Sequence, residues 1–243
     1  MEQHHWWFVG RYKILRQAIE WAVAPGVGSK IVDIGSGTGA IVAALVRDYR
    51  VIGFEPSADG VTLARQRFPG VEFRQSDPLN LPRQAISEAD LILLLDVIEH
   101  IPDDQKFLSE LVDAMTVGAH ALITVPADMR LWGAQDEAVG HVRRYDSGML
   151  LRLVDSLPVK PAFITYFNTR LYPIVRLARW ITRATGRSLG RDGTDFQMLP
   201  KPINGLLTAL FAGERRVVGA LLTQHRKQGY RYGVSLMMML TKI

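Results

Sequence analysis

Three acidic side chains follow apolar, strand-like segments in the first half of the sequence, and each could contact a small ligand. Asp33 stands two residues before a glycine-rich loop, Glu55 ends the next apolar segment, and Asp77 follows a third. If these segments are parallel strands, their carboxyl ends meet at one edge of a sheet, where open α/β sheets bind ligands. A carboxylate repels a diphosphate but attracts an ammonium or sulfonium group. The pattern therefore favours a ligand that carries positive charge as well as hydroxyl groups.

The loop after Asp33 is suited to close approach of a ligand. Gly35, Gly37 and Gly39, with Ser36 after the first, join a β-branched segment to an alanine-rich one. Glycine tolerates positive φ, and a helix start presents unpaired N–H groups. The same run satisfies the dinucleotide pattern G-x-G-x-x-G/A. Taken alone it fits a nicotinamide dinucleotide or a methyl donor, and Asp33 favours the methyl donor.

Short apolar strands alternate with helical patterns along the first half of the chain. Strands are predicted at 30–34, 51–54, 71–75, 91–95 and 119–125, and helices at 40–48, 58–67 and 103–115. Repeated β-α-β units of this kind predict an α/β fold with a doubly wound, mostly parallel sheet and right-handed crossovers. In the second half, the patterns predict a helix at 147–154 and strands at 162–167 and 234–241.

The whole chain is predicted to form one domain. We expect an N-terminal lid and helix over 1–27, a donor-binding core over 28–125, an acceptor-side loop and helical insertion over 126–213, and C-terminal sheet elements over 214–243. The first helix is predicted over 12–23. His4, His5, Trp6 and Trp7 precede it and could either cover a site or pack the helix onto the sheet.

Taken together, these features resemble the class I S-adenosylmethionine-dependent methyltransferases. The resemblance is carried by IVDIGSGTG at 31–39, Glu55, and LLDVIEHI at 94–101, and it covers roughly 28–125 well. HWWF at 5–8, the LW…H…RRY segment at 131–145 and YGVSL at 232–236 are similar to small-molecule members from sugar, polysaccharide and secondary-metabolite pathways. The resemblance implies a Rossmann-like methyltransferase fold of seven strands, with a helical insertion before the last strand.

The resemblance also implies a cofactor, a reaction and a set of contacts. The cofactor would be S-adenosylmethionine, and the methyl group would pass to an oxygen or nitrogen of a small metabolite or glycan-type acceptor. The expected donor contacts are Arg11, Asp33, Gly35, Ser36, Gly37, Gly39, Glu55, Pro56, Asp77, Leu79, Asp96 and Val97. In this set, Glu55 would bind the ribose and Asp77 the adenine amino group.

Two histidines are candidates for activating the acceptor. His100 follows the fourth predicted strand and His141 lies in the long connection after the fifth. Either could deprotonate a hydroxyl, and either could instead be a hydrogen-bonded loop histidine. The expected substrate contacts are Trp132, Arg143, Arg144 and Tyr145. The two arginines could equally form a surface ion-pair cluster. No spacing of His, Asp or Glu predicts a metal site.

Charge is distributed unevenly along the chain. Residues 1–125 carry 11 Lys/Arg and 16 Asp/Glu, whereas residues 126–243 carry 18 and 8, and the formal net charge is +5. Such asymmetry indicates an anionic partner or a solvated basic face. Without cysteines there are no disulfides or thiolate ligands. A cytoplasmic protein with a small-molecule acceptor, anionic or glycan-linked, is expected, and the residues that end the fourth strand argue against nucleic-acid amines as acceptors.

Residues 171–187 form an amphipathic helical pattern. Leu171, Ile174, Val175, Leu177, Ala178 and Ile181 share one face, and Arg176, Arg179, Arg183 and Arg187 share the other. Such a helix either lies peripherally on an anionic membrane, here the inner membrane, or packs on the core as a lid. Two further hypotheses for the chain remain: a nicotinamide-dependent oxidoreductase, and a non-catalytic relative that binds a membrane or nucleic acid through its basic half.

Overall fold

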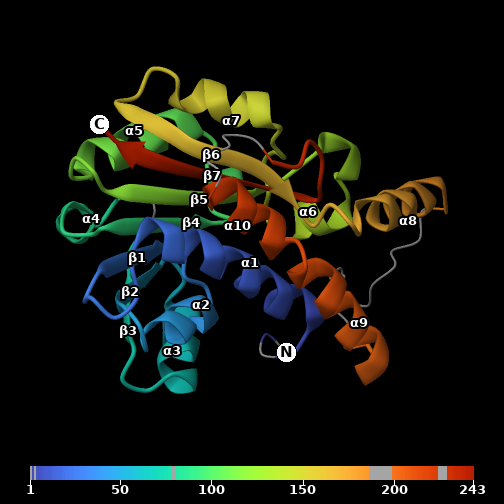
Figure 1. Ribbon diagram of the computed structural model, residues 1–243, viewed down its shortest axis with the longest axis horizontal. Helices are drawn as coiled ribbons and strands as arrows, with labels where there is room; N and C mark the ends of the chain where they lie inside the picture. The colour runs from blue at the N-terminus through green and yellow to red at the C-terminus, as the bar shows by residue number, and fades with distance from the viewer. Residues whose placement is uncertain (1, 3, 78–79, 186–198, 224–228) are drawn as a thin grey trace.

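A seven-stranded sheet lies at the centre of the computed structural model, which describes residues 2, 4–77, 80–185, 199–223 and 229–243 (Figure 1). Its strands are β1 (Lys30–Ile34), β2 (Arg50–Glu55), β3 (Glu72–Gln75), β4 (Leu91–Leu95), β5 (His120–Pro126), β6 (Val159–Phe167) and β7 (Ser235–Lys242). The order is β3-β2-β1-β4-β5-β7-β6. Strands β1 to β5 are parallel, and β7 runs antiparallel to both β5 and β6. The prediction of a mostly parallel, seven-stranded α/β sheet is confirmed.

Helices cover both faces of this sheet. One face carries α4 (Arg83–Ser87), α5 (Asp104–Ala114) and α7 (Ser147–Val154). The other carries α1 (Trp6–Ala22), α2 (Ala40–Leu45), α3 (Ala58–Arg67), α9 (Lys201–Ala212) and α10 (Arg215–Thr223). Because both faces are covered, the central strands are apolar on both sides, as in LILLL of β4.

The elements that surround the ligand edge of the sheet are short. They are the 3-10 turns η1 (Ile98–His100) and η2 (Met129–Leu131) and the helix α6 (Ala134–Ala138). Together with the loops between them, η2 and α6 make up the long connection predicted over 126–146. This connection follows β5, so it lies at the carboxyl end of the parallel strands.

In the second half, one predicted helix is present and one helix was not expected. In the insertion, α8 (Tyr172–Thr185) projects away from the body of the molecule (Figure 1). The structure also has α10, a helix within a segment for which only sheet elements were expected. Both α9 and α10 pack against α1. The apolar face of α10, which contributes Val218 and Leu222 to the core, explains why that segment is helical.

The first helix begins six residues earlier than predicted. Its start is held by Asn204 of α9, whose side-chain oxygen accepts from the Trp6 N–H at 2.8 Å and whose amide donates to the His4 carbonyl at 2.7 Å. The His5 side chain caps the helix by accepting from the Trp7 N–H at 3.3 Å. Because two of these bonds span about 200 residues of sequence, local pattern alone did not indicate this start.

Candidate functional site

The glycine loop between β1 and α2 folds back onto β2. The N–H groups of Gly35 and Ser36 both donate to the Phe54 carbonyl, at 2.8 and 2.9 Å. Gly35, Gly37 and Gly39 have φ values of 78°, 53° and 82°, in the left-handed region that favours glycine. At Gly37 an added Cβ would meet nothing within 4 Å, so a ligand can reach the backbone there.

Glu55 fixes the position of this loop. One carboxylate oxygen accepts from the Gly37 N–H at 2.8 Å and the other from the Ser57 N–H at 3.1 Å. Since an ionised carboxylate can accept about four hydrogen bonds, both oxygens keep capacity for further donors. Glu55 therefore joins the loop to the start of α3 and can still accept bonds from hydroxyl groups of a ligand.

Asp33 is a buried acid with incomplete hydrogen bonding. Its side chain is 2% exposed, and Oδ1 has no hydrogen-bond partner among the described residues. Burial raises the pKa of Asp33 to about 7, the Glu55 charge adds to this rise, and Arg11 opposes it. The Ser36 hydroxyl is also buried without a partner in the described part of the chain. A cationic group that donates hydrogen bonds would satisfy this corner of the site.

Asp96, at the end of β4, links the sheet to α1. Arg11 forms an ion pair with Asp96 at 2.6 Å and donates to the Thr124 hydroxyl at 2.9 Å, while Thr124 donates to Asp96 at 3.0 Å. The Arg11 guanidinium also lies 4.9 Å from the ring centroid of Trp7. Asp96 itself has φ 61°, an uncommon conformation for a non-glycine residue. This network places α1 across the edge where the strands end.

A cavity of ≈ 380 Å³ lies beside this network. Its aromatic lining comes from the N-terminal residues His5, Trp6, Trp7 and Phe8, and its charged lining from Arg11, Asp96, Glu99, Asp136, His141, Arg144 and Arg179. Trp6 also packs edge-on against Phe211 of α9, with ring centroids 5.9 Å apart. The N-terminal aromatics thus line the cavity and also pack the helix, an arrangement compatible with both interpretations of them.

His141 is oriented by a buried ionic network. Its Nδ1 lies 2.8 Å from Oδ1 of Asp136, a carboxylate that also accepts two hydrogen bonds from Arg144, at 2.8 and 3.1 Å. Burial alone would raise the pKa of Asp136, but the bonds from His141 and Arg144 outweigh it and lower that pKa. Because the ionised carboxylate only accepts, Nδ1 of His141 carries a proton, and in the neutral form of the ring Nε2 is the acceptor.

Glu99 faces Nε2 of His141 from η1. Its side chain is fully buried, Oε1 lies 3.8 Å from Nε2 of His141, and neither oxygen has a hydrogen-bond partner among the described residues. Burial and the nearby Asp96 charge raise its pKa well above the usual range. Glu99 was not among the site residues expected from the sequence. The available signal was an acid placed between Ile98 and Ile101, directly after an apolar strand.

The other expected residues are dispersed. His100 is exposed, with its Nδ1 3.2 Å from the Gly140 carbonyl and its ring 4.9 Å from that of His141. Burial of part of the ring and the neighbouring His141 lower the pKa of His100.

Pro56 and Asp77 are exposed at the ends of β2 and β3. Leu79 lies outside the described residues.

Val97 packs under the glycine loop. An added Cβ at Gly35 would lie 2.7 Å from its Cγ2 atom. Val97 is 6% exposed, so it supports the loop from below rather than presenting a polar group to a ligand.

Of the four expected substrate contacts, Arg144 lines the cavity. Arg143 forms an ion pair with Asp104 and donates to the Pro102 carbonyl at 2.7 Å, which is the ion-pair alternative that the sequence left open. Tyr145 is 1% exposed, and its hydroxyl donates to Asp104 at 2.7 Å. Trp132 donates to Glu137 at 3.3 Å. The positions of these three support structural roles beside the site.

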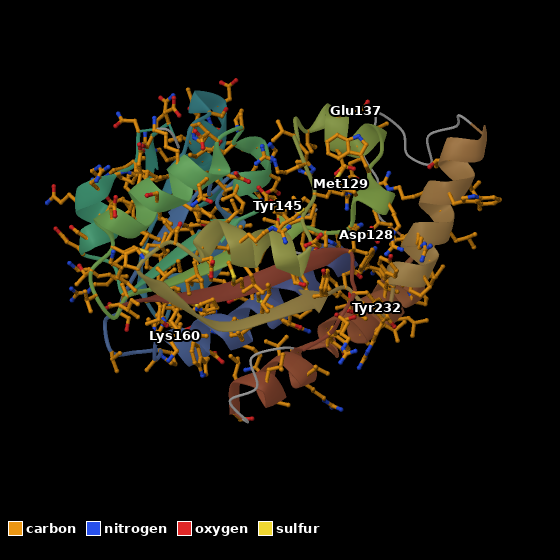
Figure 2. All side chains as sticks on the ribbon, turned by 90° about the horizontal axis from the view of Figure 1, so that it is seen from above. Asp128, Met129, Glu137, Tyr145, Lys160 and Tyr232 are labelled. Atoms are coloured by element: carbon orange, nitrogen blue, oxygen red, sulfur yellow. The ribbon has the colours of Figure 1, made fainter. Side chains whose placement is uncertain are left out.

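Arg144 also lines a second hollow, of ≈ 290 Å³. Its lining includes Asp128, Met129, Tyr145 and Tyr232. Figure 2 shows Asp128, Met129 and Tyr232 on the side of the molecule from which α8 projects, and Tyr145 nearer the middle. Lys160 lies toward the opposite end of the sheet in the same view. The acceptor-side loops therefore gather at one end of the molecule, next to α8.

Comparison with known proteins relates this fold to methyltransferases. Residues 32–121 match the model of a family described as a methyltransferase domain. A probable S-adenosylmethionine-dependent methyltransferase of Mycolicibacterium smegmatis is 26% identical over 160 residues, 64% of this chain and 60% of that protein. A ubiquinone/menaquinone biosynthesis C-methyltransferase of Campylobacter jejuni is 31% identical over 97 residues, 37% of this chain and 41% of that one.

A solved structure extends the comparison to most of the fold. A methyltransferase from Archaeoglobus fulgidus, described as dependent on S-adenosylmethionine, superposes with a TM-score of 0.58 at 14% identity, covering 94% of this chain and 91% of that one. This similarity shows the fold. The chain spans 60% or less of the length of the two curated relatives named above.

The two ends of the glycine loop should respond differently to a methyl group. Gly39→Ala places a Cβ 2.5 Å from the Phe73 ring as well as imposing a positive φ, whereas Gly37→Ala has the φ penalty alone. We expect Gly37→Ala to lower the free energy of unfolding by about 1–2 kcal/mol and Gly39→Ala by about 3–4 kcal/mol. Urea denaturation measures both, and equal losses would contradict the packing assigned to Gly39.

Proposed function

We propose that this chain, whose residues 32–121 belong to the methyltransferase-domain family and which has the class I methyltransferase fold, transfers a methyl group from S-adenosylmethionine to a small acceptor. The observation that carries the proposal is the buried, incompletely bonded carboxyl of Asp33 beside the glycine loop, with Glu55 next to it. An ammonium group satisfies Asp33, and ribose hydroxyls satisfy Glu55. A diphosphate would place like charges together, which disfavours the nicotinamide alternative.

The chain's own residues bind and orient the two substrates. S-adenosylmethionine supplies an electrophilic methyl group on a sulfonium centre. The open backbone at Gly37, the Ser36 hydroxyl and the two acids would hold the donor. The cavity next to Asp96 would hold the acceptor, and Trp6 and Trp7 would exclude water from it. Alignment of two bound reactants supplies a large share of the acceleration in such a displacement.

The cavity lining favours a polar or anionic acceptor of metabolite size. Arg144 and Arg179 provide positive charge, and the N-terminal indoles provide apolar surface. His141, oriented by Asp136, can activate an O–H or N–H group. We therefore propose an oxygen or nitrogen acceptor of the small-metabolite or glycan type. One relative is named as a C-methyltransferase, so the atom that is methylated needs a direct assay.

Donor binding tests this function most directly. Calorimetry should show that the pure protein binds S-adenosylmethionine and S-adenosylhomocysteine but not NAD. Glu55→Ala removes the acceptor of the ribose hydroxyls and of the Gly37 N–H, so the Kd for either ligand should rise at least tenfold. Glu72→Ala, an exposed acid on β3, is the matched control and should leave the Kd unchanged. Binding of NAD with no binding of either sulfur ligand would reject the proposal.

Donor affinity should also depend on pH through Asp33. The ligand's ammonium group favours the ionised carboxylate, but the pKa of Asp33 in the free protein is about 7, so below pH 7 binding must first release a proton. We expect the affinity for S-adenosylhomocysteine to rise about tenfold per pH unit from pH 5 to 7 and to level off above pH 7. Asp33→Asn should bind more weakly, with a flat profile. A wild-type profile that is flat over this range would contradict the role of Asp33.

The same carboxyl affects stability with a definite sign. The pKa of Asp33 in the folded chain lies above its ordinary value of 3.8, so its contribution to stability is fully present below about pH 4. It is lost as the pH rises through 7, because ionisation then places an uncompensated charge in the interior. A bound ammonium group removes this penalty.

We also propose that α8 contacts an anionic bilayer peripherally. Ile174, Leu177 and Trp180 are 64%, 57% and 66% exposed, whereas Arg179 turns inward, lines the cavity and donates to Gln135 at 2.7 Å. The helix thus presents these three apolar side chains to solvent, whereas Leu171, immediately before it, is buried and Val175 lines the cavity. Exposed apolar patches mark interaction sites. Arg176 is exposed beside them, which favours an anionic surface. In the described part of the chain, no helix is long and apolar enough to cross a membrane.

Vesicle sedimentation tests this contact. The full chain should sediment with vesicles that contain anionic phospholipid and remain in solution with purely zwitterionic ones. The double variant Leu177→Glu, Trp180→Glu should lose sedimentation because it places charge in the apolar face. Val117→Glu, at an equally exposed apolar position in the loop before β5, should retain it. Equal and negligible binding of the wild type to both vesicles would reject the contact.

A further inference from the structure

Glu99, His100 and His141 come together between the end of β4 and the acceptor-side loop. One potential ligand atom from each lies within 4.8 Å of the other two. Glu99 and His100 belong to η1, while His141 follows α6, so the group is assembled by the fold from segments about forty residues apart. This separation explains why spacing along the sequence did not predict a metal site.

Hydrogen bonds orient the imidazole rings of His100 and His141 in the same way. In each ring the bond is made by Nδ1, which leaves Nε2 for a ligand. The Nδ1 of His141 bonds to the Asp136 carboxylate and the Nδ1 of His100 to the Gly140 carbonyl. Because each of these oxygens can only accept, each Nδ1 donates a proton, and in the neutral ring, the form that ligates a metal, Nε2 has the lone pair. A carboxylate or carbonyl behind the ring is the usual support of a histidine that ligates a metal.

Glu99 supplies the independent observation that a ligand belongs here. A fully buried carboxyl whose two oxygens have no partner among the described residues is costly unless something satisfies it. Nε2 of His141 lies 3.8 Å from Oε1 of Glu99, too far for a hydrogen bond. Two ligands of one tetrahedral zinc ion lie roughly 3.3 Å apart. Closing this pair onto an ion therefore requires a shift of well under one ångström.

We propose that Glu99, His100 and His141 bind a divalent transition-metal ion of the Zn²⁺ type, with a remaining coordination position directed into the acceptor cavity. Two imidazoles and one carboxylate suit zinc, and also iron or manganese, better than Mg²⁺, which prefers oxygen ligands. Glu99 and His141 line the cavity, so a ligand in the open position would be part of its contents.

The consequence for the acceptor rests on the proposed methyl transfer. A hydroxyl coordinated in the open position loses its proton more readily, as water does on catalytic zinc. That proton passes to solvent, the oxygen forms the bond to the methyl carbon, and the carbon–sulfur bond breaks with its electron pair returning to sulfur. Both histidines then serve as ligands of the ion. His141 does so from the cavity wall and His100 from outside the cavity.

Metal binding is tested on the full chain after chelator dialysis, by calorimetric titration with Zn²⁺ alone. We expect one ion per chain, and at least a tenfold rise in Kd for Glu99→Gln and for His100→Asn. His100 is exposed, so its variant should fold even where Glu99→Gln does not, and circular dichroism checks both. His120→Asn, a histidine on β5 bonded to Thr241, is the matched control and should bind like the wild type. Substitution by Co²⁺ should give the visible absorption of a four-coordinate site.

Absence of stoichiometric Zn²⁺ binding would overturn the assignment, as would binding that is equal in the wild type, Glu99→Gln and His100→Asn. Titration with S-adenosylhomocysteine separates this outcome from failure of the proposed function. Donor binding should survive both chelation and His100→Asn, because the donor contacts are on β1 and β2. Loss of donor binding in the wild type would reject methyl transfer and leave the metal site standing on its own titration.

Discussion

Acidic side chains at the carboxyl edge of the sheet need partners within the protein. The segments that carry these partners are therefore held at this edge. Asp96 stands at the end of the fully apolar strand β4, and its compensation comes from Arg11 of α1 and from Thr124 of the neighbouring strand. Three elements far apart in sequence are therefore joined at one carboxylate. Removing water strengthens each of these interactions, since Coulomb energy grows as the local dielectric falls. The position of α1, and with it the aromatic cover of the cavity, depends on this network.

On the acceptor side, too, a buried acid is compensated by basic residues from another segment. Asp136 is buried in the short helix α6, and it is compensated by Arg144 and His141 from the loop that follows. Arg144 also donates to the Ala127 carbonyl at 3.0 Å, which ties the end of the loop to its beginning. A long connection of charged and aromatic residues thereby becomes a fixed wall of the cavity. Its ionic residues hold the loop in shape, and His141 is the member of the network whose second nitrogen faces the cavity.

The sequence predicted those parts of the molecule that depend on local pattern. The alternation of strands and helices, the glycine loop and the acids at the strand ends all follow from residues close together in the chain. The start of α1 did not, because it depends on Asn204, and the role of Tyr145 did not, because a tyrosine in a charged segment gives no sign that it will be buried against Asp104. The amphipathic pattern of α8 was correct as a helix. Which face points to solvent is decided by tertiary contacts, such as that between Arg179 and Gln135.

Compensation at this edge is incomplete at two carboxyls, one on each side of Asp96. Within the part of the chain that the structure describes, one oxygen of Asp33 and both oxygens of Glu99 have no hydrogen-bond partner. Natural interiors leave few polar groups unsatisfied, and an unsatisfied buried acid at a ligand-binding edge is a candidate functional group. The fold carries this penalty without ligands, and a cationic group at either position removes part of it, so binding and stability are coupled by mass action. A cationic group bound on the donor side would satisfy Asp33, and a second one bound on the acceptor side would satisfy Glu99. A single ligand would leave one of these two acids unsatisfied.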